Sequence, residues 1–449
     1  MGASRETVFK PTLGGRSSSE PSLRPDDIPR VIFLNPWDRL IGPNRYLVEM
    51  MRQSPELASR STVVFPEVND ALGEYERLGC GVAVWPEIRL IHARLTGSNI
   101  LHLLRNHSRG LARVARGMKS LHPDLVVSNS EILCLGGMAA RALGIPHIQV
   151  VHSLLFQHRK SLGVPVRAFI CFLSFWAQGF VCVSEAVRQM LKTLGVHKWT
   201  AVVPNGFDLQ EIRNQSFWPL PSPVEDLFKG RHPTLLTVGR ISPMKGQNFL
   251  VDAVRRLRPI FPSLQCFFVG RRGPPESRED ISGFSQGLFQ QIKKHNLEDT
   301  VHFLGEVDYV PGLLRRADLY VHPSLTESFS RVVAEALILR RPVVCTQEGA
   351  LPEVVGPQGA FLVPPADGQS LAQGIIQVLQ EKSLREMIIS SGREHVERHY
   401  SARHTTRQFI RVLYGAAGRR PSMGDGEILA YPYEEGILST RSLGTGSGC

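Results

Sequence analysis

The stretch LYVHPSLTESFSRVVAEAL, residues 319–337, holds the pattern from which the fold can be worked out. It opens with an apolar, strand-like run and continues through a short Pro/Ser loop. A helical period then begins near Ser328 to Ser330. A buried strand that passes through a short loop into a helix is half of a β-α-β unit. The segment therefore predicts a parallel sheet with helices packed on it.

The same alternation continues on both sides of this segment. Earlier strand-like runs are RVIFLN (30–35), DLVVSNS (124–130), HIQVVHS (147–153), GFVCVS (179–184) and TAVVPN (200–205). After a Pro-, Ser- and Trp-rich stretch at 216–223 the pattern restarts with TLLTVGR (234–240), LQCFFVGRR (264–272), TVHFLG (300–305), DLYVHPS (318–324), PVVCTQ (342–347) and AFLVPP (360–365). A restart after a linker predicts two similar α/β domains with a ligand cleft between them, faced by the carboxyl ends of the strands.

The length supports this organisation, because 449 residues of which 42% are hydrophobic exceed what one core usually organises. The predicted parts are a flexible arm (1–29), a first Rossmann-like domain (30–204), a linker (205–230), a second Rossmann-like domain (231–399), a helix returning to the first domain (400–417) and a disordered tail (418–449).

Net charge and cysteine content indicate which partners and which cellular compartment to expect. A formal net charge of +11 favours an anionic partner. The seven cysteines are scattered and form no Cys-x-x-Cys pair, which is typical of reduced thiols without a zinc module. The first thirty residues lack the apolar core of a secretory signal, and the uncharged run 168–184 is barely long enough to cross a bilayer. We therefore expect a cytoplasmic protein without a transmembrane helix.

Two carboxylates flank the start of the predicted helix in the opening segment. Free backbone amides there, with the Ser328 and Ser330 hydroxyls, would form an anion site for a phosphate. Glu327 precedes the helix and Glu335 lies within it, so each could accept hydrogen bonds from sugar hydroxyls of one extended ligand. The alternative is that Glu327 caps the helix and Glu335 is a solvated charge, and the spacing alone leaves both open.

A second cluster follows the strand at 234–238. Gly239 would let a ligand approach the backbone, while Arg240 and Lys245 would neutralise a diphosphate, including the charge that grows on it as a leaving group. The alternative is a basic surface turn. The presence of both acids and both cations favours the ligand site.

Several segments together resemble one enzyme family. They are PNGFDL (204–209), TVGRISPMKG (237–246), VHFLGEV (301–307), and HPSLTESFSRVVAEAL (322–337) followed by RRPVVCTQEGALPEVV (340–355). They resemble the retaining glycosyltransferases of family 4, over about residues 31–411 and more specifically in the second half. The resemblance implies the GT-B architecture, two facing Rossmann-like domains with the nucleotide sugar held mainly by the second.

The resemblance also implies roles for single residues. Arg240 and Lys245 would bind the donor diphosphate, and Glu335 would bind the ribose hydroxyls. Glu327 would hold the transferred sugar, with backbone amides of Ser328, Phe329 and Ser330 on phosphate or sugar. From the first domain, Gly42 would approach the phosphates and His152 would lie near the donor sugar. The sequence departs from the family where Pro43 replaces a second glycine and where Arg271 replaces an acidic residue.

No Asp-x-Asp pair occurs, so the usual device for a divalent metal on the diphosphate is missing and fixed cations should replace it. We expect no cofactor, only a nucleotide-diphosphate sugar as substrate. In the family's mechanism the donor's own phosphate oxygen accepts the proton of the acceptor hydroxyl.

A basic helical face in the first domain suggests a further partner. Its cations, spaced at 100° per residue, are Arg105, Arg109, Arg113, Arg116 and Lys119. A second segment, HRKSLGVPVRAFICFLSFW (158–176), sets cations before aromatic residues that include Phe172 and Trp176. Both fit an anionic membrane surface, on which the protein would be peripheral, or an acceptor that carries phosphate. The alternative is an ordinary Rossmann helix with a charged solvent side and an aromatic core segment.

Other functions account for less of the sequence. No recognition module or interleaved surface aromatics support nucleic-acid binding. A sugar-nucleotide epimerase of the same build, or a sugar-nucleotide binder without activity, stays open. Our prediction is a glycosyltransferase acting on a saccharide, a glycolipid or a small molecule. The sequence leaves the sugar and the nucleotide undecided.

Overall fold

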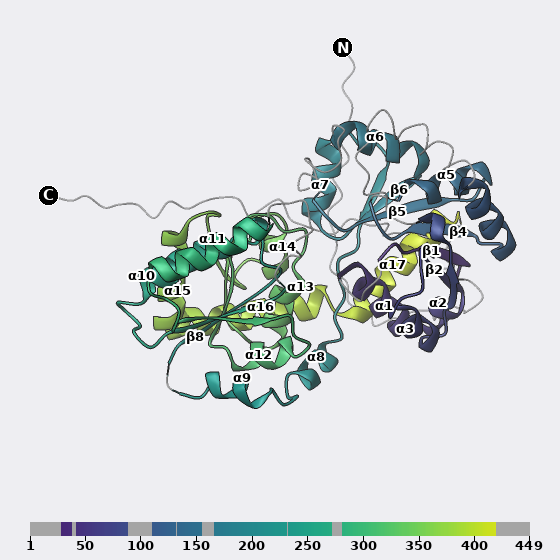
Figure 1. Cartoon of the computed structure of the whole chain (residues 1–449). Helices are drawn as coiled ribbons and strands as arrows, with labels where there is room; N and C mark the ends of the chain where they lie inside the picture. The colour runs from purple at the N-terminus through teal and green to yellow at the C-terminus, as the bar shows by residue number, and fades with distance from the viewer. Residues whose placement is uncertain are drawn as a thin grey trace, which may run out of the picture.

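The computed structural model describes residues 28–37, 42–88, 110–131, 133–154, 166–230, 232–271 and 281–418, which form two α/β units built on parallel sheets (Figure 1). The first sheet has the order β3-β2-β1-β4-β5-β6-β7, and the second has the order β10-β9-β8-β11-β12-β13. In both sheets the strand order reverses beside the first strand, between β1 and β4 and between β8 and β11. This is the Rossmann-like arrangement predicted from the sequence.

The strands of the first sheet are β1 (Val31–Leu34), β2 (Ser61–Phe65), β3 (Gly81–Val84), β4 (Leu125–Ser128), β5 (His147–Val151), β6 (Gly179–Cys182) and β7 (Trp199–Val202). Those of the second sheet are β8 (Thr234–Val238), β9 (Gln265–Val269), β10 (Val301–Gly305), β11 (Leu319–His322), β12 (Val343–Thr346) and β13 (Phe361–Val363). Every run singled out in the sequence forms a strand. Two further strands, β2 and β3, complete one side of the first sheet.

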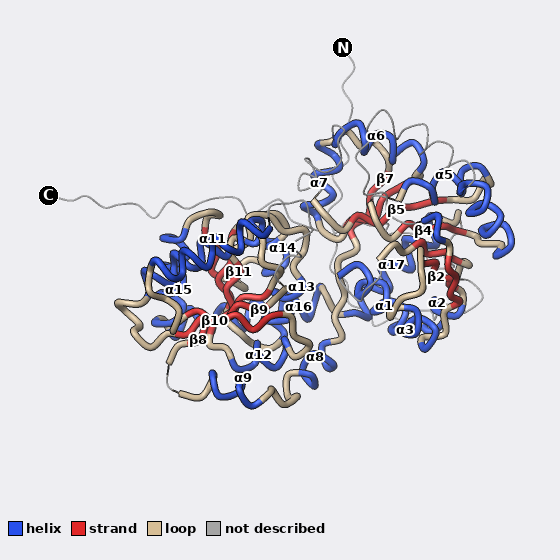
Figure 2. Tube along the Cα trace, in the orientation of Figure 1, coloured by secondary structure: helices blue, strands red, loops and turns tan. Residues whose placement is uncertain are grey.

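Helices cover both faces of each sheet (Figure 2). In the first unit they are α1 (Gly42–Gln53), α2 (Pro55–Ser59), α3 (Leu72–Arg77), a helical segment at 110–121, α5 (Cys134–Ala142), α6 (Val166–Trp176) and α7 (Glu185–Thr193). Two short helices, α8 (Leu209–Gln215) and α9 (Ser222–Leu227), follow the last strand of the first sheet. The remaining helices are α10 (Gln247–Leu257), α11 (Ile281–Lys294), α12 (Val310–Arg316), α13 (Arg331–Ile338), α14 (Leu351–Val355), α15 (Gly368–Gln380), α16 (Lys382–His399) and α17 (Ala402–Ala416).

The central strands are buried along their whole length, as β1 and β4 show. Strands covered on both faces are apolar throughout and do not alternate, which is why the sequence shows short continuous apolar runs. One continuous apolar cluster extends through both units, and two smaller clusters lie on the other faces of the two sheets.

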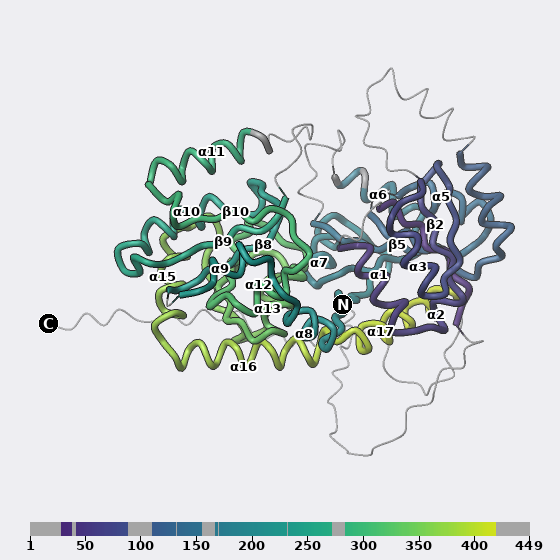
Figure 3. The backbone as a smooth tube through the Cα atoms, turned by 60° about the horizontal axis from the view of Figure 1, so that its bottom comes forward, coloured from purple at the N-terminus to yellow at the C-terminus, as the bar shows by residue number. Residues whose placement is uncertain are grey.

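The chain passes between the units twice, and the two passages are hydrogen-bonded to each other. The amide of Phe207 donates to the carbonyl of Tyr400, and the amide of Ala402 donates to the carbonyl of Phe207, both at 2.9 Å. After the second passage α17 lies beside α1 in the first unit, where the Phe409 ring meets the Tyr46 ring at 5.9 Å (Figure 3). The predicted arm and tail fall almost wholly outside the described residues.

Across the described ranges, none of the helices combines the length and the apolar character that spanning a bilayer requires.

A carboxylate also connects the two units. Both oxygens of Glu353, in α14, accept hydrogen bonds from the amide of Glu185 at the start of α7, at 2.9 and 3.0 Å. Burial raises the pKa of Glu353 to about 7, although the two amides of α7 act in the opposite direction. The charged form is therefore disfavoured in the folded protein.

This contact predicts a loss of stability as pH rises. Because the folded-state pKa of Glu353 exceeds its ordinary value of 4.5, its contribution is complete below about pH 4.5 and is lost as pH increases through about 7. Glu353→Gln should flatten this part of the curve of melting temperature against pH. Glu298→Gln, at an exposed position, serves as the control and should leave the curve unchanged. A Glu353→Gln curve parallel to that of the wild type would contradict the assignment.

Candidate active site

The predicted site residues follow strands that end at one edge of each sheet. In the first sheet Gly42 comes after β1 and His152 after β5, while in the second Arg240 comes after β8 and Glu327 after β11. Parallel strands place these positions at the carboxyl edges, next to the points where strand order reverses. The two units meet nearby, because Arg331 of α13 donates to the side-chain oxygen of Asn205 at 3.3 Å.

Lys245 and Glu327 are in direct contact. The Lys245 Nζ atom lies 2.5 Å from Glu327 Oε2. Gly246 permits this, because its φ of +64° is left-handed and a Cβ there would lie 2.0 Å from the carbonyl oxygen of Pro323. The turn that carries Lys245 can thus pack directly on the loop after β11. The Lys245 side chain is therefore half-buried in an ion pair.

A buried histidine holds Glu327 from the other side. His322 Nε2 lies 3.0 Å from Glu327 Oε2, and Nδ1 lies 3.0 Å from the Tyr320 hydroxyl. Because a carboxylate only accepts, Nε2 carries the proton and Nδ1 accepts from Tyr320. Burial lowers the pKa of His322, against the opposing effect of Glu327, and the ring is neutral at physiological pH.

These contacts keep Glu327 ionised. Burial alone would raise its pKa, but the charge of Lys245 and the hydrogen bond from His322 outweigh burial and lower it to about 2. Glu327 does not cap α13, whose first turn receives no side-chain hydrogen bond. The carboxylate is therefore a preformed acceptor at the carboxyl edge of β11, and the capping alternative is wrong.

The loop before α13 has a strained end. The helix begins at Arg331, and Ser330 before it has φ +68° and ψ 87°, in the left-handed region. Phe329 is only 3% exposed and lies between the rings of Phe207 and Tyr400, at 6.2 and 5.2 Å between centroids. Its side chain therefore belongs to the core, and only its backbone can serve the predicted donor site. The Ser328 side chain is partly exposed.

Glu335 is buried, with 7% exposure, so the alternative of a solvated surface charge is wrong. Burial raises its pKa, while Arg331 and Arg45 lower it. The Nε atom of Arg331 lies 3.9 Å from Glu335, and the guanidinium lies over the Phe207 ring at 4.6 Å. Arg45 belongs to α1, so the first unit also contributes positive charge to the surroundings of Glu335.

The other predicted residues of the second unit are more open. The Arg240 side chain is exposed, and its carbonyl accepts a hydrogen bond from Gln247 Nε2 at 3.0 Å. A Cβ at Gly239 would lie 3.6 Å from the Lys245 side chain, so this glycine borders the lysine stem.

In the first unit His152 is held in one tautomer. Its Nε2 lies 2.8 Å from Asn129 Oδ1, and the Asn129 amide donates to the carbonyl of Pro43 at 3.1 Å. The carbonyl of Pro43 can only accept, which fixes the orientation of the Asn129 amide and leaves the proton on His152 Nε2. Burial lowers the pKa of His152 to about 3, so the ring is neutral. A Cβ placed on Gly42, the first residue of α1, would meet no atom of the described residues within 4 Å.

The basic face lies apart from these residues. Arg105 and Arg109 fall outside the described residues, while Arg113, Arg116 and Lys119 are exposed on the helical segment 110–121. One of them, Arg113, pairs with Glu87 at 3.1 Å. On α6 Phe172 and Phe175 are 46% and 56% exposed, and each ring meets Trp176 edge-on.

Comparison with protein families decides the membership of the chain. Residues 41–211 match the model described as Glycosyltransferase Family 4, and residues 223–395 match the model described as Glycosyl transferases group 1. The chain belongs to the group 1 and family 4 glycosyltransferases. This confirms the resemblance predicted from the motifs.

Among curated proteins, this glycosyltransferase is 26% identical over 266 residues to the gpi3 subunit of phosphatidylinositol N-acetylglucosaminyltransferase of Schizosaccharomyces pombe, covering 58% of this chain and 54% of that protein. It is 29% identical over 250 residues to phosphatidyl-myo-inositol mannosyltransferase of Mycobacterium tuberculosis, covering 54% and 60%. The matches thus span little more than half the length of these relatives.

Among solved structures, Anabaena HepE in complex with UDP superposes with a TM-score of 0.69 at 22% identity, covering 86% of this chain and 100% of HepE. Sucrose-phosphate synthase of Thermosynechococcus elongatus gives 0.66 at 21% identity, covering 86% and 99%. The fold of this glycosyltransferase is therefore GT-B, as predicted.

Four residues in the site were not predicted: His322, Arg331, Arg45 and Asn129. Of these, His322 had a signal in the sequence, since it ends a buried strand five positions before Glu327. Arg331 precedes Glu335 by four residues on the same helix, a spacing visible in the sequence, but its contacts with Phe207 and Asn205 join separate elements. Arg45 and Asn129 act only through such contacts, which no local pattern indicates.

The strain at Ser330 predicts opposite responses to two substitutions. Valine is β-branched and ill-suited to a φ of +68°, so Ser330→Val should lower the free energy of unfolding by about 2 kcal/mol. Ser330→Gly suits this φ and should change it by no more than about 1 kcal/mol. Urea denaturation of both variants measures the difference. Equal losses would show that the backbone conformation of Ser330 is not the determinant.

Proposed function

We propose that this protein transfers a sugar from a nucleotide-diphosphate sugar to an acceptor hydroxyl, with retention at the anomeric carbon. The observation that carries the proposal is the Lys245–Glu327 pair at the carboxyl edge of β11, with the exposed Arg240 on the neighbouring turn. The description of HepE as a complex with UDP-glucose supports a donor of this class. Two cations and an ionised acceptor match the two chemical parts of such a donor.

The ion pair between Lys245 and Glu327 suits a binding step in which the diphosphate takes the place of Glu327 as the partner of Lys245. A diphosphate arriving at Lys245 would replace the single contact with Glu327 by contacts to phosphate oxygens, with Arg240 as a second cation. Glu327, still oriented by His322, would then accept hydrogen bonds from hydroxyls of the transferred sugar. At the other end of the ligand Glu335 would accept from the ribose hydroxyls, and the amides near Ser328 to Ser330 would face phosphate or sugar.

The reaction then needs no protein nucleophile. The bond between the anomeric carbon and the diphosphate oxygen breaks, and the acceptor oxygen bonds to the same face of that carbon. The acceptor proton passes to the departing phosphate oxygen. Arg240 and Lys245 stabilise the charge that grows on the diphosphate, which is the role a divalent metal has elsewhere. Neutral His152 would face the sugar without bringing a charge.

A panel of UDP-, GDP- and ADP-sugars tests this proposal. We expect free nucleotide and a new glycoside of retained configuration, in the presence of EDTA as in its absence. An epimerised donor would instead indicate a sugar-nucleotide epimerase, and binding without turnover would indicate a silent binder. Either result contradicts the proposed transfer.

Variants of the same protein assign the roles. Arg240→Ala and Lys245→Ala should each lower kcat about a hundredfold, since each removes a preorganised charge partner of the leaving group. Glu335→Ala should mainly raise the KM for the donor. Arg256→Ala, which removes an arginine paired with Asp252 on α10, is the control. Near-normal turnover in both Arg240→Ala and Lys245→Ala would refute the diphosphate assignment.

We further propose that the first unit docks on the cytoplasmic face of an anionic membrane and that the acceptor is a saccharide or a lipid-linked molecule. Exposed Phe172 and Phe175 on α6 would enter the interface while Arg116 and Lys119 face lipid phosphates. The names of the phosphatidylinositol-linked relatives agree with a lipid-linked acceptor.

Liposome flotation measures this docking. The protein should float with phosphatidylglycerol vesicles and much less with phosphatidylcholine vesicles, and Phe172→Ser/Phe175→Ser should reduce flotation. Because both side chains are already exposed, the double variant should keep its melting temperature. No flotation with either lipid removes the proposal.

A further inference from the structure

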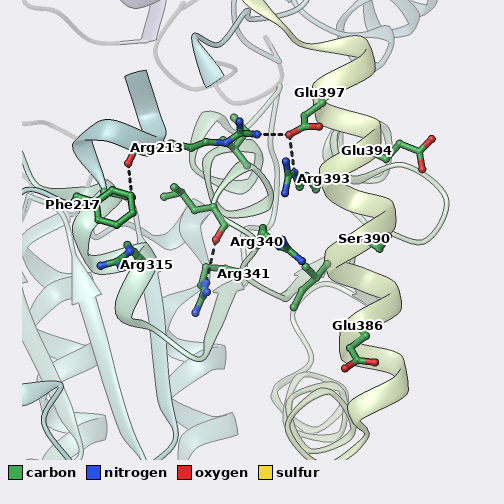
Figure 4. A pocket seen from close by; sticks show the side chains of 14 residues that line it. Arg213, Phe217, Arg315, Arg340, Arg341, Glu386, Ser390, Arg393, Glu394 and Glu397 are labelled. Atoms are coloured by element: carbon green, nitrogen blue, oxygen red, sulfur yellow. Dashed lines mark hydrogen bonds and ion pairs between the residues drawn. The ribbon is translucent and has the colours of Figure 1, made fainter. Parts of the chain in front are cut away.

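A concave surface separate from the candidate active site lies in the second unit, beside α16. It is a cavity of ≈ 1050 Å³ between α8, the carboxyl ends of α12 and α13, and α16 (Figure 4). Five arginines line it: Arg213, Arg315, Arg340, Arg341 and Arg393. None of the residues assigned above to the donor site is among its lining residues.

The carboxylates along α16 already have cationic partners. Glu397 pairs with Arg213 and Arg393, the latter at 2.7 Å. Further along the helix, Glu394 pairs with Arg398 at 2.6 Å, and Glu386 lies 3.7 Å from Lys382. This wall of the cavity is close to electrically balanced.

The opposite wall is not balanced. Among the described residues, no carboxylate forms an ion pair with Arg315, Arg340 or Arg341. The guanidinium of Arg341 donates to the carbonyls of Ala317 and Leu339, and that of Arg315 lies over the Phe217 ring at 4.0 Å. Burial lowers the pKa of Arg341, and Arg315 and Arg340 lower it further, against the effect of Asp318.

Helix dipoles account for only part of these cations. The carboxyl ends of α12 and α13 both point here, and each supplies roughly half a negative charge. Two helix ends thus offset about one of three arginines. The backbone at Arg340 is also unusual, because its φ of +58° lies in the region where glycine is normally found. An arginine with this backbone conformation is less favourable for folding than a glycine would be, so stability does not explain its presence here.

We propose that this cavity binds the phosphate group of an anionic ligand at Arg315, Arg340 and Arg341, separately from the donor site. Guanidinium groups bind phosphate oxygens through paired, charge-assisted hydrogen bonds, and three of them line this one cavity. Phe217, Ile338 and Leu339 border the same space and would contact the carbon part of the ligand. The ligand is either a soluble organic phosphate or the phosphate headgroup of a lipid.

The position of the cavity connects it to both chain passages. Its α8 wall follows the first passage at Phe207, and its α16 wall ends immediately before Tyr400 in the second. One lining helix, α13, also begins at the donor site and ends two residues before Arg340. A phosphate here would compete with Glu397 for Arg393 of the same helix and for Arg213, whose ion pair with Glu397 joins α8 to α16.

Titration of the full chain with inorganic phosphate, followed by calorimetry, tests the site. Arg315→Ala/Arg340→Gly should weaken binding at least about tenfold, the expected loss of charge-assisted contacts. Both side chains are exposed and glycine suits the φ of Arg340, so the variant should fold. Arg403→Ala, at another exposed arginine on α17, should bind as the wild type does.

Two further variants separate this site from the donor site. Glu397→Gln frees Arg213 and Arg393 and should tighten phosphate binding by about threefold or more. Lys245→Ala should retain it whether or not the proposed transferase activity is correct. Unchanged binding in Arg315→Ala/Arg340→Gly, weaker binding in Glu397→Gln, or loss in Lys245→Ala would each overturn the proposal.

Vesicles distinguish the two sources of phosphate. Phosphatidylcholine vesicles with and without phosphatidic acid are floated with the wild type and with Arg315→Ala/Arg340→Gly. If the double variant loses soluble phosphate but floats as the wild type does, the ligand is soluble, and if it loses both, the ligand is a lipid headgroup. Binding of neither probe by the wild type would refute the site.

Discussion

The contact among Phe207, Phe329 and Tyr400 is the interaction on which the arrangement of the two units depends. Phe207 lies in the first passage between the units, Tyr400 lies in the second, and Phe329 belongs to the loop between β11 and α13. Burial of rings of this size stabilises a fold by several kcal/mol, with the aromatic contacts adding to it. Because Phe329 is only two residues from Glu327, the core that joins the units also fixes the loop carrying the candidate sugar-binding carboxylate.

Burying Phe329 in this way places backbone strain on Ser330. A chain that buries Phe329 and then begins α13 at Arg331 must turn sharply between them, and Ser330 takes a left-handed conformation to do so. The turn aims the Ser330 hydroxyl at His322 Nε2, 3.3 Å away, beside the Glu327 carboxylate. Local strain at a site is tolerated where the surrounding core determines it, and here that core is apolar and continuous through both units.

The sequence predicted the fold well because its information was local. Short apolar runs show buried parallel strands directly, and the restart of the pattern near residue 234 shows a second unit. Both β2 and β3 were missed. The outer strand β3 is partly exposed. Its short apolar run VAV is not bounded by polar residues as the runs of the central strands are, so it does not stand out in the sequence. In the site, Lys245 and Glu327 were assigned to different parts of one ligand, and their direct contact across 82 residues was not predicted. They meet because they follow β8 and β11, adjacent strands of one sheet.

What the sequence could not show is which charges are already neutralised. In the sequence Arg331, Lys245 and Arg340 are simply three cationic residues, yet their surroundings in the folded protein differ. Arg331 lies over Phe207 and near Glu335, so an arriving anion would have to disrupt the packing between the units. Lys245 has one carboxylate partner in a partly exposed pair, which a diphosphate can replace without moving the backbone. Arg340 is exposed and has no carboxylate partner among the described residues. These differences in compensation, which depend on tertiary contacts, determine which cation is structural, which can exchange partners and which still has an unmet charge.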